Sequence, residues 1–452
     1  MGSLPLAILV FLLLRIPLLP HAPKGVDVFF HLLAAKRFEG GLPRRLGAFI
    51  VGDEYTYPPL FHFLLSLIPE GARERAPLLI GIASDLGSMI LVHAVSSALF
   101  GEAVAAIAAL AYAVTPMNYI ESIWQTPRPL GIFLYNLSMA LLLLAPQPAR
   151  PLAAPSIALL LLSHRLSAQA LWLSSALLIP ILIEGDPPAI LWIPIGFALA
   201  IAASKGFYLK ALKDHLKVIG FHLRYGEMGR GRKRPGNPLD LAKLNPFAAI
   251  PFLGLVAHGE LLADRLLWWL AAALILFFAW IWGDGHRYLA FASFPASVLS
   301  ARLLLLGSPA IPIAAAMASA FAISAIKVYR SARSFANRPF YSPLRALGIP
   351  RSSRAFTPDV LNYALPYYAG CMTLCGYGSE ALRFWRERLH PLTKERLRAV
   401  SEEYGLTHIL MPPGEADKVP EGFERRGEVL GHLLFERAEP GHGGAGFARS
   451  RD

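Results

Sequence analysis

Charged residues are scarce in this 452-residue sequence: they make up 16% of it, whereas hydrophobic residues make up 55%. The chain is therefore far more apolar than a soluble globular protein. Cysteine is scarcer still, because Cys371 and Cys375 are the only two, and they form no four-ligand zinc pattern. The sequence leaves open whether they form a disulfide or stay thiols. No internal repeat of solenoid or propeller period is present.

Long apolar runs, by contrast, recur along the chain. A spanning helix needs about 20 mostly apolar residues. Eleven segments follow this pattern: 4–20, 76–99, 103–117, 128–145, 152–163, 166–183, 187–204, 246–258, 264–282, 288–306 and 310–327. The first run lacks a basic n-region and a small-residue cleavage site, so we expect it to stay as a helix. The sequence thus predicts an all-α polytopic membrane bundle of about eleven transmembrane helices.

Shifts in composition divide the chain into three predicted regions. Residues 1–327 form the transmembrane domain, including a polar first external loop at 21–75 and a basic loop at 205–245. Residues 328–437 are expected to form a small soluble α/β domain, and 438–452 a flexible tail.

The soluble domain is predicted from short patterned segments. Strands are expected at CMTLCGY and THILMPP, helices at SEALRFWRERL and TKERLRAVSEEYG, and a hairpin or strand at GEVLGHLLFERA.

The formal net charge of +12 is concentrated in the basic loop 205–245, which holds ten Lys or Arg against three acidic residues. In a membrane protein, we expect this loop to bind anionic lipid head groups or lipid phosphates rather than nucleic acid. With eleven spans, the loops that carry the candidate catalytic and binding residues would all lie on one side of the membrane. The positive-inside rule would make that face cytoplasmic, but long loops count less in this rule, so the sequence leaves the side open.

Several short motifs follow one another in a familiar order. The loop begins VDVFFHLLAAKRFEGGLP and ends YTYPPLFHFLLSLIPEG, and later segments read LFGE, TPMNYIESIWQTPRP, LLSHRLSAQALWL, GHRYLAFASFPASVL and EEYGLTHILMPP. This arrangement resembles the glycosyltransferase C superfamily of membrane enzymes, which includes protein O-mannosyltransferases, aminoarabinose transferases and oligosaccharyltransferases. These enzymes use polyprenyl-phosphate or diphosphate sugar donors. Two departures are visible: a WWDYG-like acceptor motif is absent, and Asp27 is followed by Val28 rather than by a glutamate.

The resemblance implies that Asp27 is the catalytic carboxylate. The pKa of a carboxylate at a membrane interface can be shifted so that it acts as a general base. The alternative is that Asp27 caps the next helix. His31 lies one turn on and would bind a metal or a phosphate, or be an ordinary interfacial histidine. Asp53 and Glu54 would complete a site for a divalent metal, Mg or Mn, or bind sugar hydroxyls beside Tyr57, or form a solvated turn.

The other expected substrate contacts come from turns between spans. Glu121, Gln125 and Arg128 surround Trp124 and suit a sugar, or anchor the chain at the interface. Arg165 and Arg287 would hold the departing phosphate, or snorkel to the interface. His164 and His286 beside them would add hydrogen bonds or protons.

These expectations together predict an inverting membrane glycosyltransferase. It would transfer a sugar from a polyprenyl-phosphate donor to a lipid-linked glycan or protein acceptor, on the extracytoplasmic side of the plasma membrane. Its partners would be these substrates and membrane lipids, and not nucleic acid. The alternatives are a transporter or flippase of lipid-linked sugars and a non-catalytic membrane scaffold.

Overall fold

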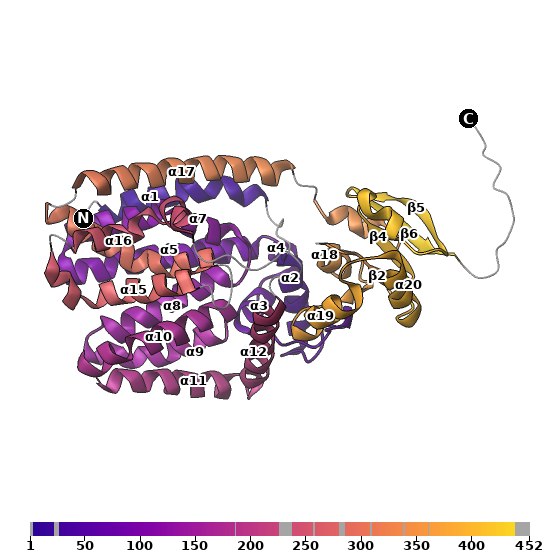
Figure 1. Cartoon of the computed structure of the whole chain (residues 1–452), viewed down its shortest axis with the longest axis horizontal. Helices are drawn as coiled ribbons and strands as arrows, with labels where there is room; N and C mark the ends of the chain where they lie inside the picture. Colours follow the sequence, from indigo (N-terminus) through magenta and orange to yellow (C-terminus); the bar gives the residue numbers. More distant parts are fainter. Residues whose placement is uncertain are drawn as a thin grey trace. The chain divides into compact units, whose positions relative to one another are not determined.

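A computed structural model describes residues 3–21, 27–185, 187–225, 237–255, 258–279, 285–307, 310–337, 340–359 and 361–438. It divides into two compact units (Figure 1). The first comprises residues 1–44 and 56–339, and the second comprises residues 45–55 and 340–452. The predicted flexible tail at 439–452 lies outside the described residues.

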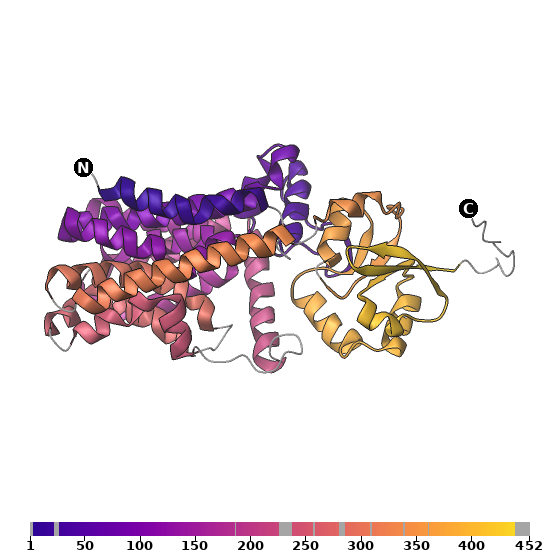
Figure 2. The same cartoon turned by 90° about the horizontal axis from the view of Figure 1, so that it is seen from above.

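The first unit is a bundle of helices whose long members run side by side (Figures 1 and 2). Its principal helices are α1 (Ser3–Arg15), α5 (Ala76–Phe100), α6 (Glu102–Val114), α7 (Pro116–Ile123), α8 (Arg128–Leu143), α9 (Ala153–Leu161), α10 (Arg165–Gly185), α11 (Trp192–Ala203), α15 (Arg265–Ala279), α16 (Leu289–Leu305) and α17 (Ala310–Asn337). Aromatic contacts such as Trp269 stacked on Phe294, with ring centroids 4.8 Å apart, fill its core.

Four helical segments of the described chain are long and apolar enough to cross a membrane, namely Ala76–Phe100, Arg165–Glu184, Gly285–Leu305 and Ile311–Ser334. Counting each of two bent helix pairs as one span brings the number to six. Shorter apolar helices occupy Leu4–Pro20, Arg128–Leu143 and Arg265–Phe278. The chain is thus an integral membrane protein, but the predicted count of eleven spans is not confirmed, because several predicted spans form helices of fewer than 18 residues.

Both bends have a local backbone cause. Between α6 and α7 the axis turns by 55° at Thr115–Pro116, where proline lacks the N–H that would continue the helix. A turn of 111° separates the Pro187–Ala203 segment from α12 (Phe207–Tyr225). There Lys205 and Gly206 adopt φ angles of 50° and 81°, which end a right-handed helix.

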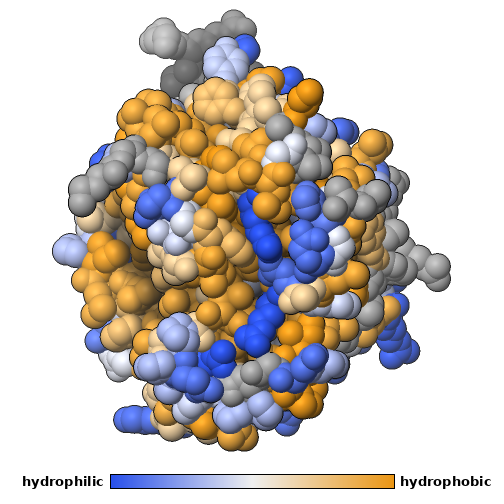
Figure 3. All heavy atoms as spheres, turned by 90° about the vertical axis from the view of Figure 1, so that its left-hand side faces the viewer, coloured by the Kyte–Doolittle hydropathy of each residue, from blue (hydrophilic) through white to orange (hydrophobic). Residues whose placement is uncertain are grey.

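Short helices lie across one end of the bundle. They are α2 (Val28–Arg37), α3 (Leu60–Ser66), α4 (Glu70–Arg73) and α12 (Figure 1). Apolar side chains cover most of the face seen from the other end, with a narrow hydrophilic band across it (Figure 3). The end that holds α2, α3 and α12 thus carries His31 and part of the basic segment 205–245.

The second unit contains a six-stranded sheet in the order β1-β3-β2-β4-β6-β5. Its strands are β1 (Phe49–Val51), β2 (Arg354–Phe356), β3 (Met372–Cys375), β4 (His408–Met411), β5 (Phe423–Val429) and β6 (His432–Arg437). The helices are α18 (Leu361–Tyr368), α19 (Ser379–Phe384) and α20 (Lys394–Glu403). The predicted strands at 371–377 and 407–413 and the predicted terminal hairpin are confirmed, as are helices at 379–389 and 393–405.

Strand β1 comes from the first loop, some 300 residues before the strand it pairs with. Phe49 lies opposite Thr373 and Val51 opposite Cys375 in a parallel pair. Ideal Cβ atoms show how tight this edge is: one on Gly376 would lie 2.2 Å from the Gly52 carbonyl oxygen. Residues 45–55 and the C-terminal segment therefore share one sheet and lie on the same side of the membrane.

The boundaries of the second unit differ from the predicted 328–437. Helix α17 continues to Asn337, because its apolar pattern runs directly into the polar stretch without a helix stop. Within the unit, Cys371 and Cys375 are buried, free thiols, which answers the question that the sequence left open.

Candidate functional site at one end of the bundle

Asp27 directly precedes α2, at the N-cap position. Its side chain makes no capping hydrogen bond, and its backbone is already helical, with φ −78° and ψ −13°. A helix cap is normally an extended residue whose side-chain oxygen accepts a backbone N–H. The capping alternative therefore does not account for the Asp27 carboxyl group.

The charges that act on Asp27 come from two distant parts of the sequence. The side chain is solvent-accessible, yet desolvation by the surrounding protein raises the pKa of its carboxyl group, and the charges of Arg128 and Arg287 oppose that rise. The first turn of α8 carries Arg128, and Arg287 lies in the 3-10 turn Gly285–Tyr288 before α16. Folding thus brings the expected base within electrostatic range of two guanidinium groups.

His31 belongs to a compact aromatic cluster rather than to a charged site. His31 Nδ1 lies 2.8 Å from His62 Nε2, and the two rings stack with centroids 5.0 Å apart. Tyr57 packs edge-on against His31 at 5.3 Å. Burial lowers the pKa of His31 to about 3 and that of His62 well below its usual value. Both imidazoles are therefore neutral at pH 7, and His62 is a partner that the sequence did not reveal.

Glu121 and Arg128 form a close ion pair between α7 and α8. Arg128 Nη1 donates to both carboxylate oxygens of Glu121, at 2.9 and 2.8 Å. Gln125 lies in the intervening turn, buried and with a φ of 55°, a left-handed conformation that is uncommon for residues other than glycine. Trp124 beside it is half exposed. The turn therefore holds a half-exposed aromatic side chain and a charged pair, and a sugar contact here stays a prediction.

Arg165 is held by residues from two other segments. Its Nη2 donates to Asp214 Oδ2 at 2.8 Å and to the Thr56 carbonyl oxygen at 2.8 Å. Thr56 Oγ1 donates to the same oxygen of Asp214 at 2.9 Å. The guanidinium carbon also lies 5.2 Å from the centre of the Tyr57 ring. Helix α12 thus supplies a carboxylate to the expected phosphate-binding arginine, a role for Asp214 that the sequence did not indicate.

A second contact joins α12 to α10 one turn further along. His215 Nε2 and Gln169 Nε2 lie 2.9 Å apart, and Tyr288 Oη donates to Gln169 Oε1 at 3.3 Å. His164 is buried, with Nδ1 3.0 Å from the Ser167 hydroxyl. Burial lowers the pKa of His164, and the charges of Arg128 and Arg287 add to this effect.

Of the other expected residues, His286 is exposed beside Arg287. Asp53 and Glu54 belong to the second unit. There Asp53 Oδ1 accepts the backbone N–H groups of Ala48 and Phe49 at 3.0 and 3.1 Å, and Oδ2 accepts that of Gly47 at 3.1 Å.

The metal expectation finds no ligand set in the part of the chain that the structure describes. No group of three or more His, Cys, Asp or Glu residues there could hold a metal ion. Asp53, one of the expected ligands, is occupied by three backbone donors. A Mg or Mn requirement therefore stays a prediction, without a cluster of protein ligands among the described residues to support it.

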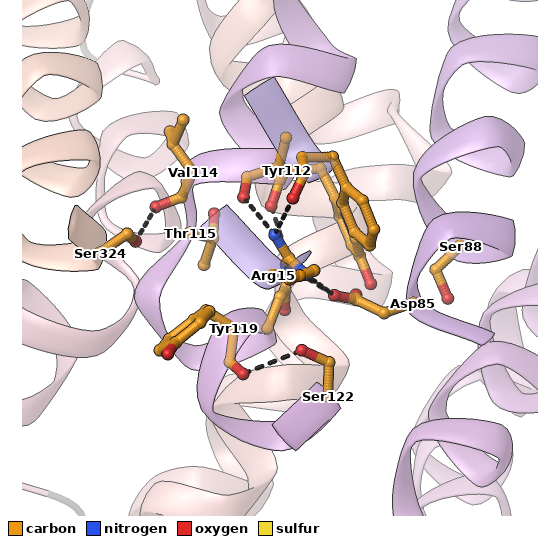
Figure 4. A network of polar contacts seen from close by, with 12 residues as sticks. Arg15, Asp85, Ser88, Tyr112, Val114, Thr115, Tyr119, Ser122 and Ser324 are labelled. Atoms are coloured by element: carbon orange, nitrogen blue, oxygen red, sulfur yellow. Dashed lines mark hydrogen bonds and ion pairs between the residues drawn. The ribbon is translucent and has the colours of Figure 1, made fainter. Parts of the chain in front are cut away.

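A buried ion pair lies deeper in the bundle (Figure 4). Arg15 on α1 donates from Nε and Nη2 to Asp85 Oδ2 on α5, at 2.9 and 2.6 Å. Its Nη1 donates to the carbonyl oxygens of Phe11 and Ala113, at 3.4 and 3.2 Å. In the sequence both residues are charges inside apolar runs, which is a signal for an intramembrane partner. The pair ties α1 to α5 and to the end of α6.

Known proteins resemble the chain in structure only. ArnT from Cupriavidus metallidurans bound to undecaprenyl phosphate has 13% identity and a TM-score of 0.63, and the match covers 95% of this chain and 96% of that one. The archaeal oligosaccharyltransferase AglB from Archaeoglobus fulgidus, in complex with an inhibitory peptide and a dolichol-phosphate, has 12% identity and a TM-score of 0.61, with 92% and 69% covered. A structure of an Archaeoglobus fulgidus oligosaccharyltransferase in complex with Zn and sulfate also matches, at 14% identity, a TM-score of 0.58 and 92% and 68% coverage. No protein-family model and no curated protein sequence matches significantly.

Proposed function

We propose, from the premise that this chain has the glycosyltransferase C fold of AglB and ArnT, that it is a membrane glycosyltransferase with a polyprenyl-phosphate-linked sugar donor. The acceptor would be a lipid-linked glycan or a protein, on the extracytoplasmic side of the plasma membrane. The observation that carries this proposal is the electrostatic effect of Arg128 and Arg287, from two distant segments, on the Asp27 carboxyl group at the start of α2. A base beside cations is what transfer from a phosphate donor requires.

In the proposed reaction, an acceptor hydroxyl oxygen attacks the anomeric carbon from the face opposite the phosphate. Asp27 takes the hydroxyl proton as the new carbon–oxygen bond forms. The bond between the anomeric carbon and the phosphate oxygen breaks, and its electron pair leaves with the polyprenyl phosphate. The anomeric configuration is inverted.

Arg287 and Arg165 would stabilise the charge on the departing phosphate, since each guanidinium group can donate two hydrogen bonds to phosphate oxygens and stays charged. Of the two, Arg287 is the one that acts on Asp27. Glu121 already binds Arg128 through both oxygens, so we assign that pair to the sugar together with Gln125. The proposed steps involve no metal, and a Mg or Mn requirement stays a prediction that a chelator would test.

Transfer of radiolabelled sugar from a panel of polyprenyl-phosphate donors tests the proposal, with purified wild-type protein, Asp27→Asn and the matched surface variant Asp417→Asn. Loss of a general base typically costs about 10²- to 10⁴-fold in rate. We expect that loss in Asp27→Asn and not in Asp417→Asn. Equal transfer by Asp27→Asn and wild type would remove Asp27 from the reaction. Movement of intact lipid-linked sugar across the bilayer, without transfer, would favour the flippase alternative.

A further inference from the structure

Helix α12 differs in composition from the apolar helices beside it. Its 19 residues include five charged ones, Lys210, Lys213, Asp214, Lys217 and Arg224. This number is too high for a segment surrounded by hydrocarbon. The helix also lies 111° away from the apolar segment that precedes it, and it crosses the end of the bundle (Figure 1). Since the bundle helices are expected to run along the membrane normal, α12 is expected to run along the membrane surface.

One face of α12 is attached to the bundle. Tyr208, Ala211 and His215 are buried and follow the spacing of three and four residues that marks one helix face. The Tyr208 ring packs edge-on against Phe197 with centroids 5.6 Å apart. Asp214 and His215 bind Arg165 and Gln169 on α10. These contacts fix the orientation of α12 about its own axis and therefore determine which residues face away from the bundle.

An apolar stripe runs along the outward side. Leu209, Leu216 and Leu223 are 48%, 59% and 59% exposed. Residues seven apart lie within about 20° of the same direction on a helix, so the three side chains form one row. A row of large exposed leucines is a surface that water does not favour.

A basic stripe runs beside the leucines. Lys213, Lys217 and Arg224 are exposed. At about 100° per residue, their mean direction is roughly 80° from that of the leucine row around the helix axis. Lysine and arginine beside an apolar row can extend to lipid phosphates while their stems cover apolar surface. This combination is typical of helices that lie in the interface of a bilayer.

We propose that α12 is an interfacial helix that binds anionic phospholipids of the membrane. Leu209, Leu216 and Leu223 enter the boundary between head groups and acyl chains, and Lys213, Lys217 and Arg224 bind the phosphate groups of anionic lipids. A lipid surface fits better than a protein partner, because it satisfies both stripes at once: the apolar one with acyl chains and the basic one with phosphates. The proposal concerns the outward face of α12 and does not depend on the glycosyl transfer.

Nitroxide labelling in nanodiscs tests it. Cys371 and Cys375 are buried, so a label attached to Leu216→Cys or Lys213→Cys reports one site. In discs of phosphatidylcholine with phosphatidylglycerol, we expect the label at 216 to collide with oxygen and the label at 213 with a water-soluble nickel chelate. We also expect phosphatidylglycerol to immobilise the label at 216.

The charge-reversed variant Lys213→Glu/Lys217→Glu/Arg224→Glu should need at least about tenfold more phosphatidylglycerol for half of that immobilisation. The control Arg351→Glu/Arg383→Glu/Arg398→Glu changes the net charge equally on exposed residues of the second unit and should behave as wild type.

Three further outcomes would overturn the proposal. Immobilisation that is independent of phosphatidylglycerol would make the basic stripe an ordinary solvated surface. Immobilisation in phosphatidylcholine discs by a small fraction of undecaprenyl phosphate, or by inorganic phosphate, would assign the stripe to the donor or to free phosphate. Dipolar broadening between two labelled copies would show that a second copy of the chain covers the leucines. None of these readouts uses transfer activity, so a failure here is distinguishable from a failure of the proposed function.

Discussion

Asp214 and Arg165 are 49 positions apart in sequence, and one carboxylate oxygen of Asp214 accepts both Arg165 Nη2 and the hydroxyl group of Thr56, at 2.8 and 2.9 Å. A helix that crosses the end of the bundle thereby fixes an arginine at the start of another helix. This three-residue contact makes α12 part of the site.

The effects of Thr56→Val and Asp214→Asn on stability should not be additive. Thr56→Val removes the hydroxyl group, at a net cost of about 1 kcal/mol in stability, and Asp214→Asn removes the charge. Both residues act through the same carboxylate oxygen. We therefore expect the loss of unfolding free energy in the double variant to be smaller than the sum of the two single losses, by at least about 0.5 kcal/mol. Chemical denaturation in detergent measures all three. Strict additivity would show that the two residues act independently.

The pH dependence of activity should report the charge of Arg287. Asp27 must be ionised to accept a proton, and desolvation by the surrounding protein raises its pKa, so kcat/KM should fall as the pH falls through that raised value. Arg287 lowers the pKa of Asp27, so Arg287→Gln should move the acidic limb to higher pH. The pH profile of transfer by both proteins checks this. A limb at the same pH in the variant would mean that Arg287 does not act on the titrating group.

The histidine pair should make the protein less stable in acid. His31 has a pKa of about 3 in the folded protein and an ordinary value of about 6.5 when unfolded. The unfolded chain therefore binds more protons between these values, and stability falls as the pH drops from about 6.5 towards 3. Each such proton contributes about 1.4 kcal/mol per pH unit. The single variant His62→Phe should show a shallower fall in unfolding free energy, and an unchanged slope would contradict it.

The buried ion pair should be costly to break and cheap to replace. Removing one partner of such a pair typically costs about 3–5 kcal/mol, because the other charge stays buried alone. Asp85→Asn should therefore lower the unfolding temperature strongly. The apolar double variant Arg15→Met/Asp85→Leu should recover most of the loss. A double variant as unstable as Asp85→Asn would mean that the bundle needs the polar contact itself.

Gly376→Ala should detach β1 from the sheet. A Cβ there would lie 2.2 Å from a backbone oxygen of Gly52, which the backbone cannot accommodate without moving. We expect amide hydrogens of residues 49–51 to exchange faster in this variant. Gly414→Ala, where nothing lies within 4 Å of the added carbon, is the matched control. Equal protection of 49–51 in both variants would show that the edge tolerates the change.

Much of the fold could be predicted from local pattern. The apolar runs, the strands at 372–375 and 408–411 and the hairpin of β5 and β6 each depend on periodicity within a few residues. Span number was less predictable, because apolar helices of nine to sixteen residues such as α8 and α9 carry the same composition as full spans. Strand β1 was not predicted, since a three-residue edge strand has too little pattern of its own.

Candidate site residues could be recognised in the sequence where a charge interrupts an apolar segment. They could not be recognised where the role of a residue depends on a partner that is distant in sequence. Asp27, Arg128, Arg165 and Arg287 stand out in the sequence for the first reason. Asp214 does not, because it lies among the lysines of a basic loop, where a single carboxylate looks like ordinary surface charge. His62 lies within an apolar segment, and only the fold brings it to His31.

The sequence by itself determined that this chain is a membrane protein with a charged C-terminal segment and a handful of polar residues near the ends of apolar helices, because these properties depend on composition and short-range spacing. Only the tertiary structure decided that Asp27 lies within electrostatic range of two arginines, that Asp214 binds Arg165, that Arg15 pairs with Asp85 and that residues 49–51 complete a distant sheet. Each of these contacts joins segments tens to hundreds of residues apart, and such contacts arise from packing of whole elements, which no local pattern records.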